Sequence, residues 1–234
     1  MTTFNAFGSS EKNYGKTSKP VWLGTVAPHA VGGVFASAAM IAGAHYAAGT
    51  PVKLAEGVIT PLIGFKVVAF SAAAGSETVD TITVLPASFG GAKVIPAADD
   101  VLQALGATFA AGGKAAVVAS VTALTGDDAG KYQITVLHSA NLGTLSAGDI
   151  LVYSASDAAG SNKAVKDIPN GYLYNDVYIG DLASPKATGA VVDFHGEGLL
   201  ADFTPAYPIK AQMKAAVPNV VLVEFPDDAF VTVE

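Results

Sequence analysis

The chain has 234 residues and a net charge of -7, and although 51% of its residues are hydrophobic only 14% are charged. It contains no cysteine and no arginine, which excludes disulfides, thiolate metal sites, cysteine nucleophiles and bidentate arginine contacts to phosphate or guanine. Because its lysines form no basic run, we expect no nucleic-acid partner, and so charge-poor a surface favours burial against other proteins.

The N-terminal residues predict an extended arm. Residues 1–19 are polar and show neither helical nor strand periodicity. Large apolar rings are unusual in a linker, because exposed rings promote association. The arm therefore either folds back on its own domain or docks on another subunit. Its candidate docking residues are Phe4, Phe7, Tyr14 and Trp22.

The next stretch, residues 20–52, has no charged side chain. It is rich in Ala and Gly and contains Pro28, His29 and His45, which argues against a membrane-spanning helix. Residues 20–46 have the small, apolar and uncharged composition of a segment that adds a strand to a partner's sheet. We also expect no secretory signal peptide, since the first residues lack a basic start and an apolar run.

From residue 45 the chain has the pattern of β-strands. AGTPVKLAEGVITPL predicts a hairpin that turns at Glu56-Gly57, and its bracketing residues Pro51 and Pro61 predict a position at a sheet edge. GFKVVAF is a predicted strand, Gly75-Ser76 a predicted turn, and TVDTITVLP a predicted strand of alternating polarity.

PAADDVLQALG predicts a short helix over residues 96–106. Asp99 and Asp100 suit the N-terminal end of a helix, and Gly106 suits its C-terminal end. The apolar face of this helix would comprise Val101, Leu102 and Leu105.

The remaining segments are mainly predicted strands. AAVVASVTAL and KYQITVLHS flank GDDAG as a second hairpin, GDILVYSA is a strand and SDAAGSN a loop. GYLYNDVYIG, TGAVVDFHGEGLL and VVLVEF are further strands, and FPDDAFVTVE is a tail. PIKAQMKAAV predicts a short helix that begins at Pro208. The fold class is therefore mainly β and barrel-like, with two short helices and an extended N-terminal arm.

Two segments have a similar order of features. The stretches that begin at Ala48 and Ala147 each place a glycine, a hydrophobic strand, a polar turn, a second short strand and a glycine-opened apolar strand in succession. This order fits a duplication, and it fits equally one β-unit that an inserted segment interrupts.

The strand pattern AGTPVKL, with the strand pair after it, resembles the lambda-type head-decoration proteins of bacteriophages, which have a β-tulip fold. ATGAVVDFHGEGLLADFTP resembles the closing segment of that family. NGYLYNDVYIG with IKAQMKAAVPNVVLVEF is similar to the head-fibre proteins of crAss-like phages. These are turn and strand patterns without a catalytic signature.

The resemblance implies a domain organisation and a function. Residues 1–44 would be a capsid-docking arm, residues 45–65 plus 145–234 a β-tulip-like decoration domain, and residues 66–144 an inserted or duplicated β-rich domain. The implied protein is a homotrimer on the outer capsid surface of the virion, where it stabilises the shell or forms the base of a head fibre. Its implied partners are the major capsid protein, its own copies and other head-fibre or auxiliary capsid proteins.

No motif predicts catalysis, a cofactor or a metal. The histidines His29, His45, His138 and His195 lack metal-ligand spacing, and GxSxG, GxGxxG and GxxxxGK[ST] do not occur. Asp99-Asp100 reads as a helix cap and Asp127-Asp128 as a hairpin tip. We therefore expect no enzyme. The alternative function is a virion-surface adhesin for host glycans or proteins. Tyr172, Tyr174 and Tyr178 are its candidate stacking residues, although we favour packing within the strands for these three side chains.

Overall fold

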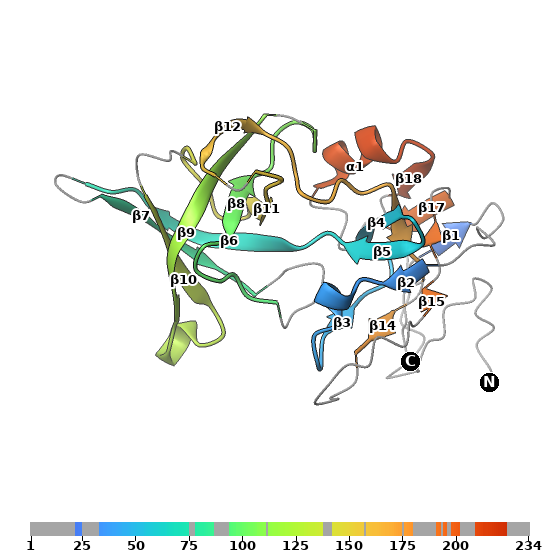
Figure 1. Cartoon of the computed structure of the whole chain (residues 1–234), viewed down its shortest axis with the longest axis horizontal. Helices are drawn as coiled ribbons and strands as arrows, with labels where there is room; N and C mark the ends of the chain where they lie inside the picture. The colour runs from blue at the N-terminus through green and yellow to red at the C-terminus, as the bar shows by residue number, and fades with distance from the viewer. Residues whose placement is uncertain are drawn as a thin grey trace, which may run out of the picture. The chain divides into compact units, whose positions relative to one another are not determined.

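The computed structural model divides the chain into two compact units (Figure 1). Unit 1 comprises Met1–Pro61 and Pro169–Glu234, and unit 2 comprises Leu62–Ile168. The residues that the structure describes are 22–24, 33–74, 78–86, 94–110, 112–137, 142–156, 158–174, 176–179, 191–192, 194–195, 198–201 and 209–223. Both units consist mainly of β-strands, which confirms the predicted fold class.

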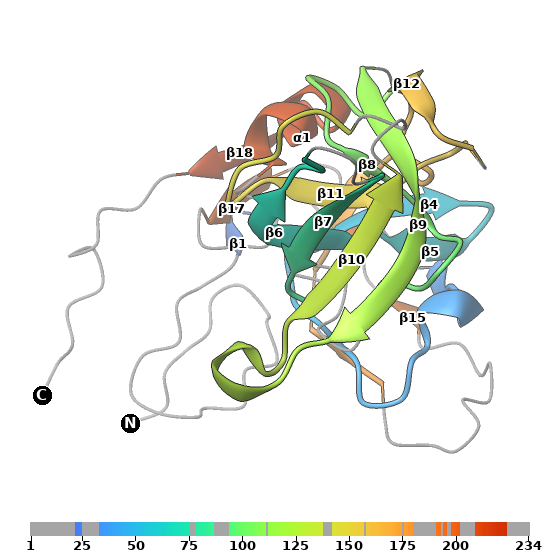
Figure 2. The ribbon, with the colours of Figure 1, turned by 90° about the vertical axis from the view of Figure 1, so that its left-hand side faces the viewer.

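Unit 2 is a closed antiparallel barrel of six strands. Its strands are β6 (Gly64–Ser71), β7 (Val79–Val84), β8 (Val101–Ala104), β9 (Gly113–Ala123), β10 (Tyr132–Leu137) and β11 (Ile150–Tyr153). They are hydrogen-bonded in the order β10-β7-β6-β11-β8-β9, and β9 pairs with β10 to close the ring (Figure 2). A further strand, β12 (Gly160–Lys163), pairs with the first residues of β9 on the edge opposite β8.

The barrel interior is filled by alternate residues of these strands, as a closed sheet requires. Phe65 on β6 faces its cross-strand partner Leu151 on β11, and the ring of Phe65 meets Tyr153 edge-on at 5.7 Å. The fully buried members of this interior are Phe65, Val67, Ile82, Val84, Leu102, Ala116, Val118, Ile134 and Leu151. Burial of each Val, Leu, Ile or Phe side chain contributes about 1.5–3 kcal/mol, so the interior is the main source of stability in unit 2.

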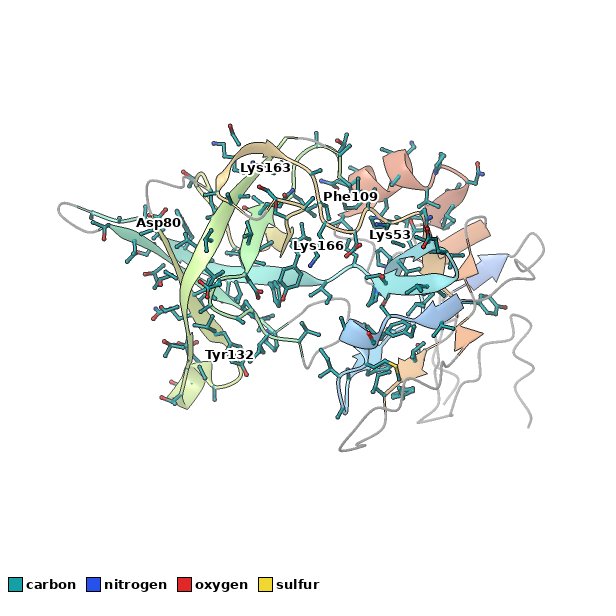
Figure 3. All side chains as sticks on the ribbon, viewed as in Figure 1. Lys53, Asp80, Phe109, Tyr132, Lys163 and Lys166 are labelled. Carbon is teal, nitrogen blue, oxygen red and sulfur yellow. The ribbon has the colours of Figure 1, made fainter. Side chains whose placement is uncertain are left out.

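A second buried layer lies on the outer side of β8 and β9. Gln103 and Ala115 are cross-strand partners whose side chains point away from the barrel interior, and both are fully buried. Gln103 donates a hydrogen bond from Nε2 to the carbonyl oxygen of Lys163 on β12, at 3.3 Å. Phe109 and Lys163 lie on this side of the barrel (Figure 3). Strand β12 and the segment around Phe109 therefore cover this part of the wall.

Unit 1 contains a six-stranded mixed sheet in the order β15-β2-β5-β4-β13-β16. Its strands are β2 (Gly33–Phe35), β4 (Pro51–Ala55), β5 (Val58–Pro61), β13 (Gly171–Leu173), β15 (Val191–Val192) and β16 (Phe194–His195). Strands β2 and β5 are parallel, and the other pairs are antiparallel. The core of this unit comprises Phe35, Ala39, Ala44, Tyr46, Val52, Ile59, Leu173, Val177 and Ile179.

Two smaller sheets complete unit 1. Strand β3 (His45–Tyr46) pairs with β14 (Val177–Tyr178). Strand β17 (Gly198–Ala201) lies between β1 (Trp22–Gly24) and β18 (Val220–Val223). The predicted C-terminal helix is confirmed as α1 (Lys210–Ala216), and its buried face includes Met213. A single-turn 3-10 helix, η1 (Ser37–Ala39), follows β2.

Asn170 joins the two parts of unit 1 that are distant in the chain. Its backbone N–H donates to the carbonyl of Val52, and its side-chain Nδ2 donates to the carbonyl of Leu54 at 2.9 Å. The backbone N–H of Leu54 donates to Oδ1 of Asn170 at 2.8 Å. The Asn170 amide thus continues the β4–β13 ladder beyond Gly171 and satisfies backbone groups that would otherwise be unpaired.

Both predicted hairpins are confirmed. Strands β4 and β5 turn at Glu56 and Gly57, whose φ angles of 51° and 77° fit the type I′ turn that suits a two-residue hairpin loop. Strands β9 and β10 are connected through a 3-10 turn, η2 (Gly126–Asp128).

The predicted helix over residues 96–106 is wrong, because Val101–Ala104 form strand β8. The φ of Asp99 is 70°, which lies outside the helical region. The carboxylate of Asp100 accepts a hydrogen bond from the N–H of Ala97, a residue that precedes it, whereas a helix-capping carboxylate accepts from residues that follow it. The acidic pair therefore shapes a turn that leads into a strand.

The proline pair does not mark a sheet edge as predicted. Strands β4 and β5 lie inside the six-stranded sheet. Pro51 is the first residue of β4 and Pro61 the last of β5, and strand ends tolerate the missing N–H. The predicted loop SDAAGSN is also partly wrong, because its last residues belong to β12.

The domain boundaries of the structure differ from those inferred from the sequence. Within the expected arm of residues 1–44, β2 and η1 belong to unit 1, and Phe35 lies in its core. Unit 2 begins at Leu62 and runs to Ile168, so residues 145–168 lie with the inserted stretch. The reason is that β11 pairs with β6 and β8 of the barrel. Gly75-Ser76, residues 1–21 and residues 224–234 lie outside the described residues.

Candidate functional site

Only one of the four predicted docking residues falls on described structure. Trp22 lies in β1, and its backbone is in register with Leu200 of β17 in the same chain. Phe4, Phe7 and Tyr14 lie outside the described residues. The structure therefore places Trp22 in a sheet of unit 1 and does not bring it together with the other three.

An exposed aromatic pair on the two-stranded sheet is the candidate binding site. Tyr178 on β14 and His45 on β3 are cross-strand partners. Their rings stack with a centroid distance of 4.1 Å and an interplanar angle of 10°. The Tyr178 side chain is 70% exposed, which is unusual for a large ring that could pack inward.

Asp176 adds a carboxylate beside this pair. Its Oδ1 accepts a hydrogen bond of 2.7 Å from the backbone N–H of Ala48, which fixes the carboxylate in place. Its Oδ2 lies 3.5 Å from Nε2 of His45 and accepts a long 3.5 Å hydrogen bond from the hydroxyl of Tyr178. We call Tyr178, His45 and Asp176 the aromatic platform.

The aromatic platform has the chemistry of a stacking site with a polar rim. The exposed face of an aromatic ring attracts cations and accommodates flat, weakly polar surfaces, including the C–H face of a sugar ring. The carboxylate of Asp176 can accept hydrogen bonds from hydroxyl or ammonium groups of such a ligand.

The three tyrosines proposed as stacking residues do not form one surface. Tyr172 on β13 is fully buried, and burial raises the pKa of its hydroxyl above the ordinary value. Tyr174 is half-buried. Of the three, Tyr178 has the exposure that a stacking residue needs, whereas the burial of Tyr172 agrees with the favoured alternative of packing within the strands.

Of the histidines, His45 alone has a described side chain, and it stacks on Tyr178. His195 lies in β16, where its backbone is in register with Tyr172, and His29 and His138 lie outside the described residues. Among the residues that the structure describes, no group of three or more His, Asp or Glu side chains could hold a metal ion.

The acidic pairs have structural partners. Oδ2 of Asp100 accepts hydrogen bonds from Ala97 N–H at 2.7 Å and from the hydroxyl of Tyr153 at 3.2 Å. Burial, and secondarily the neighbouring Asp100 carboxylate, raise the pKa of Tyr153 above its ordinary value. Asp128 at the β9–β10 hairpin pairs with Lys131 at 2.5 Å.

Sequence reasoning missed the roles of Asp80 and Asp176. Asp80 near the start of β7 is only 3% exposed, and its Oδ1 accepts a hydrogen bond from the N–H of Ala73 (Figure 3). Strand alternation places Asp80 on the same face as Ile82 and Val84, so the period of two could have predicted an inward carboxylate. No sequence signal identified Asp176, because its partners His45 and Ala48 come from a distant part of the chain.

No helix in the described part of the chain is long and apolar enough to cross a membrane. Comparisons with protein-family models, curated proteins and solved structures find no match for the chain.

Proposed function

We propose that this chain is a structural virion protein that decorates the outer surface of a phage capsid. In this proposal it stabilises the shell or forms the base of a head fibre, and its partners are the major capsid protein and its own copies. It acts through binding surfaces rather than through a reactive centre.

The pairing of β4 with β13 is the observation that carries this proposal. The segment that resembles the decoration proteins, AGTPVKL, supplies β4, and the C-terminal segment that resembles head-fibre proteins supplies β13. The resemblance implies that these two stretches share one domain, and Val52 is in register with Gly171 in one sheet. The glycine-opened strand expected after the hairpin is β6, which begins at Gly64.

The proposal is tested with purified capsids prepared with and without the chain. We expect the chain to sediment with the shells at saturable occupancy and to raise the temperature at which they release DNA. Two results contradict a stabilising role. Either the shells bind none of the chain, or fully occupied shells release their DNA at the same temperature as shells without the chain.

Capsid docking through the N-terminal residues is tested by a truncation. The structure assigns Trp22–Gly24 to a sheet of unit 1, so the deletion should stop at residue 21. We expect the truncated chain to keep its circular dichroism spectrum and to lose capsid attachment. Full occupancy by the truncated chain would exclude a docking role for Phe4, Phe7 and Tyr14.

The aromatic platform favours a second candidate function, a virion-surface adhesin that binds glycans. We expect Tyr178→Ala to abolish binding to an array of bacterial capsular and lipopolysaccharide oligosaccharides, and Tyr178→Phe to preserve most of it. Tyr132→Ala, at a half-buried tyrosine of the barrel, is the control. Binding that survives Tyr178→Ala, or an array with no bound glycan, excludes this candidate.

A further inference from the structure

Asn170 and Gly171 form the one asparagine–glycine pair in the sequence. An asparagine side chain reacts most readily with the backbone nitrogen of the next residue when that residue is glycine, because glycine has no side chain to hinder the approach. Asn170 is exposed to water, and Gly171 is the first residue of strand β13 in unit 1. The pair therefore has the sequence and the solvent access of a deamidation site.

Deamidation at this pair consumes water and needs no other reactant. Solvent base removes the proton from the Gly171 nitrogen, and this nitrogen attacks Cγ of Asn170. A bond from Cγ to the Gly171 nitrogen forms, the bond from Cγ to Nδ2 breaks, and Nδ2 takes a proton from water and leaves as ammonia. Water then opens the cyclic succinimide at either of its carbonyl groups, which gives aspartate or isoaspartate.

In the folded chain both polar atoms of the Asn170 carboxamide are held by strand β4. Nδ2 donates to the carbonyl of Leu54 at 2.9 Å, and Oδ1 accepts from the N–H of Leu54 at 2.8 Å. The backbone N–H of Asn170 donates to the carbonyl of Val52 at 3.0 Å. The attack requires Cγ to turn toward the Gly171 nitrogen, and this rotation would break both bonds to Leu54. The contact of Asn170 with β4 therefore opposes the reaction.

The backbone of Gly171 is restrained as well. Gly171 is buried and is in register with Val52 of β4. The next residue, Tyr172, is in register with Pro51 of β4 on one side and with His195 of β16 on the other, and its side chain is fully buried. Strand β13 is thus held from both sides, so its first residue approaches the Asn170 side chain only when the sheet opens locally.

We infer that Asn170 is a deamidation site that the closed β4–β13 pairing protects and that opening of unit 1 exposes. The isoaspartate product carries one more carbon in the backbone, which displaces Gly171 from its register with Val52. The aspartate product has no donor for the carbonyl of Leu54. Either product weakens the contact that held the original side chain. A copy of unit 1 that has opened and reacted therefore opens more readily than an unmodified copy.

The test measures the rate of deamidation of the full chain, folded and in urea, at mildly alkaline pH. Peptide mass spectrometry quantifies the replacement of the Asn170 amide by a carboxyl group, and an isoaspartyl methyltransferase assay detects isoaspartate. We expect the folded chain to react at least about tenfold more slowly than the chain in urea, because only the open fraction reacts. Asn170→Gln should remove the product under both conditions, since its longer side chain closes a larger ring more slowly.

Core variants show which unit controls the reaction. Phe35 shares a core with Val52 of β4 and Leu173 of β13, so Phe35→Ala should raise the rate in the folded chain at least about tenfold. Phe65→Ala removes a buried ring of the same kind from the barrel and should leave the rate unchanged. Tyr46→Phe is a milder change in the core of unit 1 and should raise the rate by a smaller factor, which keeps the test decisive if Phe35→Ala does not fold.

Three results overturn the inference. The first is an equal rate in the folded chain and in urea, which would show that the bonds to Leu54 give no protection. The second is a rate that neither Phe35→Ala nor Tyr46→Phe raises, or that Phe65→Ala raises as much as they do. The third is a purified deamidated chain whose hydrogen-exchange protection in β4 and β13 equals that of the unmodified chain.

Discussion

Unit 1 and unit 2 differ in how the order of strands in space follows the order of strands in the chain. In the barrel, β6–β7, β8–β9 and β9–β10 are neighbours both in the chain and in the sheet. In unit 1, β4 pairs with β13, and Leu54 is bonded to Asn170, which is 116 residues away. Local contacts form faster than distant ones, because a long loop must close before a distant contact forms. The comparison therefore teaches that the barrel can form from its own continuous segment, whereas unit 1 needs both ends of the chain.

The largest expected effect is the loss of stability when one buried ring is removed from the core of either unit. Phe65→Ala removes a fully buried ring from the barrel, and Phe35→Ala removes a ring that lies 4.8 Å from Tyr46 in unit 1. Each should cost about 3–5 kcal/mol. Hydrogen exchange should show lost protection in the barrel for Phe65→Ala and in unit 1 for Phe35→Ala. Equal loss in both units for either variant would break the comparison.

Alkaline pH should weaken both units through buried tyrosines. Burial raises the pKa of Tyr46 from 10.0 to about 12, and burial with the Asp100 carboxylate raises that of Tyr153. The folded state favours the neutral form of each buried phenol. The contribution of the neutral phenols to the free energy of unfolding is therefore fully present below pH 10 and is lost as the pH rises through 12. The loss at Tyr46 should approach about 2–3 kcal/mol.

Urea titrations between pH 8 and 12 measure this effect. Tyr46→Phe should reduce the alkaline loss in unit 1, although it also removes the hydrogen bond from the Tyr46 hydroxyl to the carbonyl of Ala39. That bond should cost about 1 kcal/mol at neutral pH. A Tyr46→Phe chain with an unchanged pH dependence would show that Tyr46 does not titrate in this range.

Gly113→Ala should destabilise the outer layer of the barrel by about 1–3 kcal/mol. A Cβ at this position would lie 2.2 Å from Nε2 of Gln103 and 3.0 Å from the carbonyl oxygen of Lys163. Gln103→Ala combined with Gly113→Ala should recover part of the loss, because it removes the closest clash. Denaturant unfolding measures both, and additive losses in the double variant would contradict this geometry.

The smallest expected effect tests the link between the two parts of unit 1. Asn170→Ala leaves the N–H and C=O of Leu54 without their side-chain partner and should cost about 1 kcal/mol, because the site is exposed to water. Asn170→Asp keeps the acceptor for Leu54 N–H and should cost less. If both variants lose the same stability, the hydrogen bond from Nδ2 of Asn170 to the carbonyl of Leu54 accounts for the whole effect.

Local sequence patterns predicted most of the strands, but they could not predict contacts between residues that are distant in the chain. Alternation identified β7, and Glu56-Gly57 identified the β4–β5 hairpin, because both depend on neighbouring residues. The helix prediction at residues 96–106 failed because Asp100 bonds back to Ala97 and hydrogen bonds with β9 and β11 decide the state of β8. The exposure of Tyr178 and the burial of Tyr172 depend on which strands pair across more than a hundred residues, and residue type does not encode that.

Electron cryo-microscopy of intact particles with and without the chain tests the central claim most directly. The account predicts symmetric density on the outer capsid surface, of a size that holds the two units of each copy, that vanishes in particles lacking the chain. Identical particle surfaces with and without the chain would contradict it.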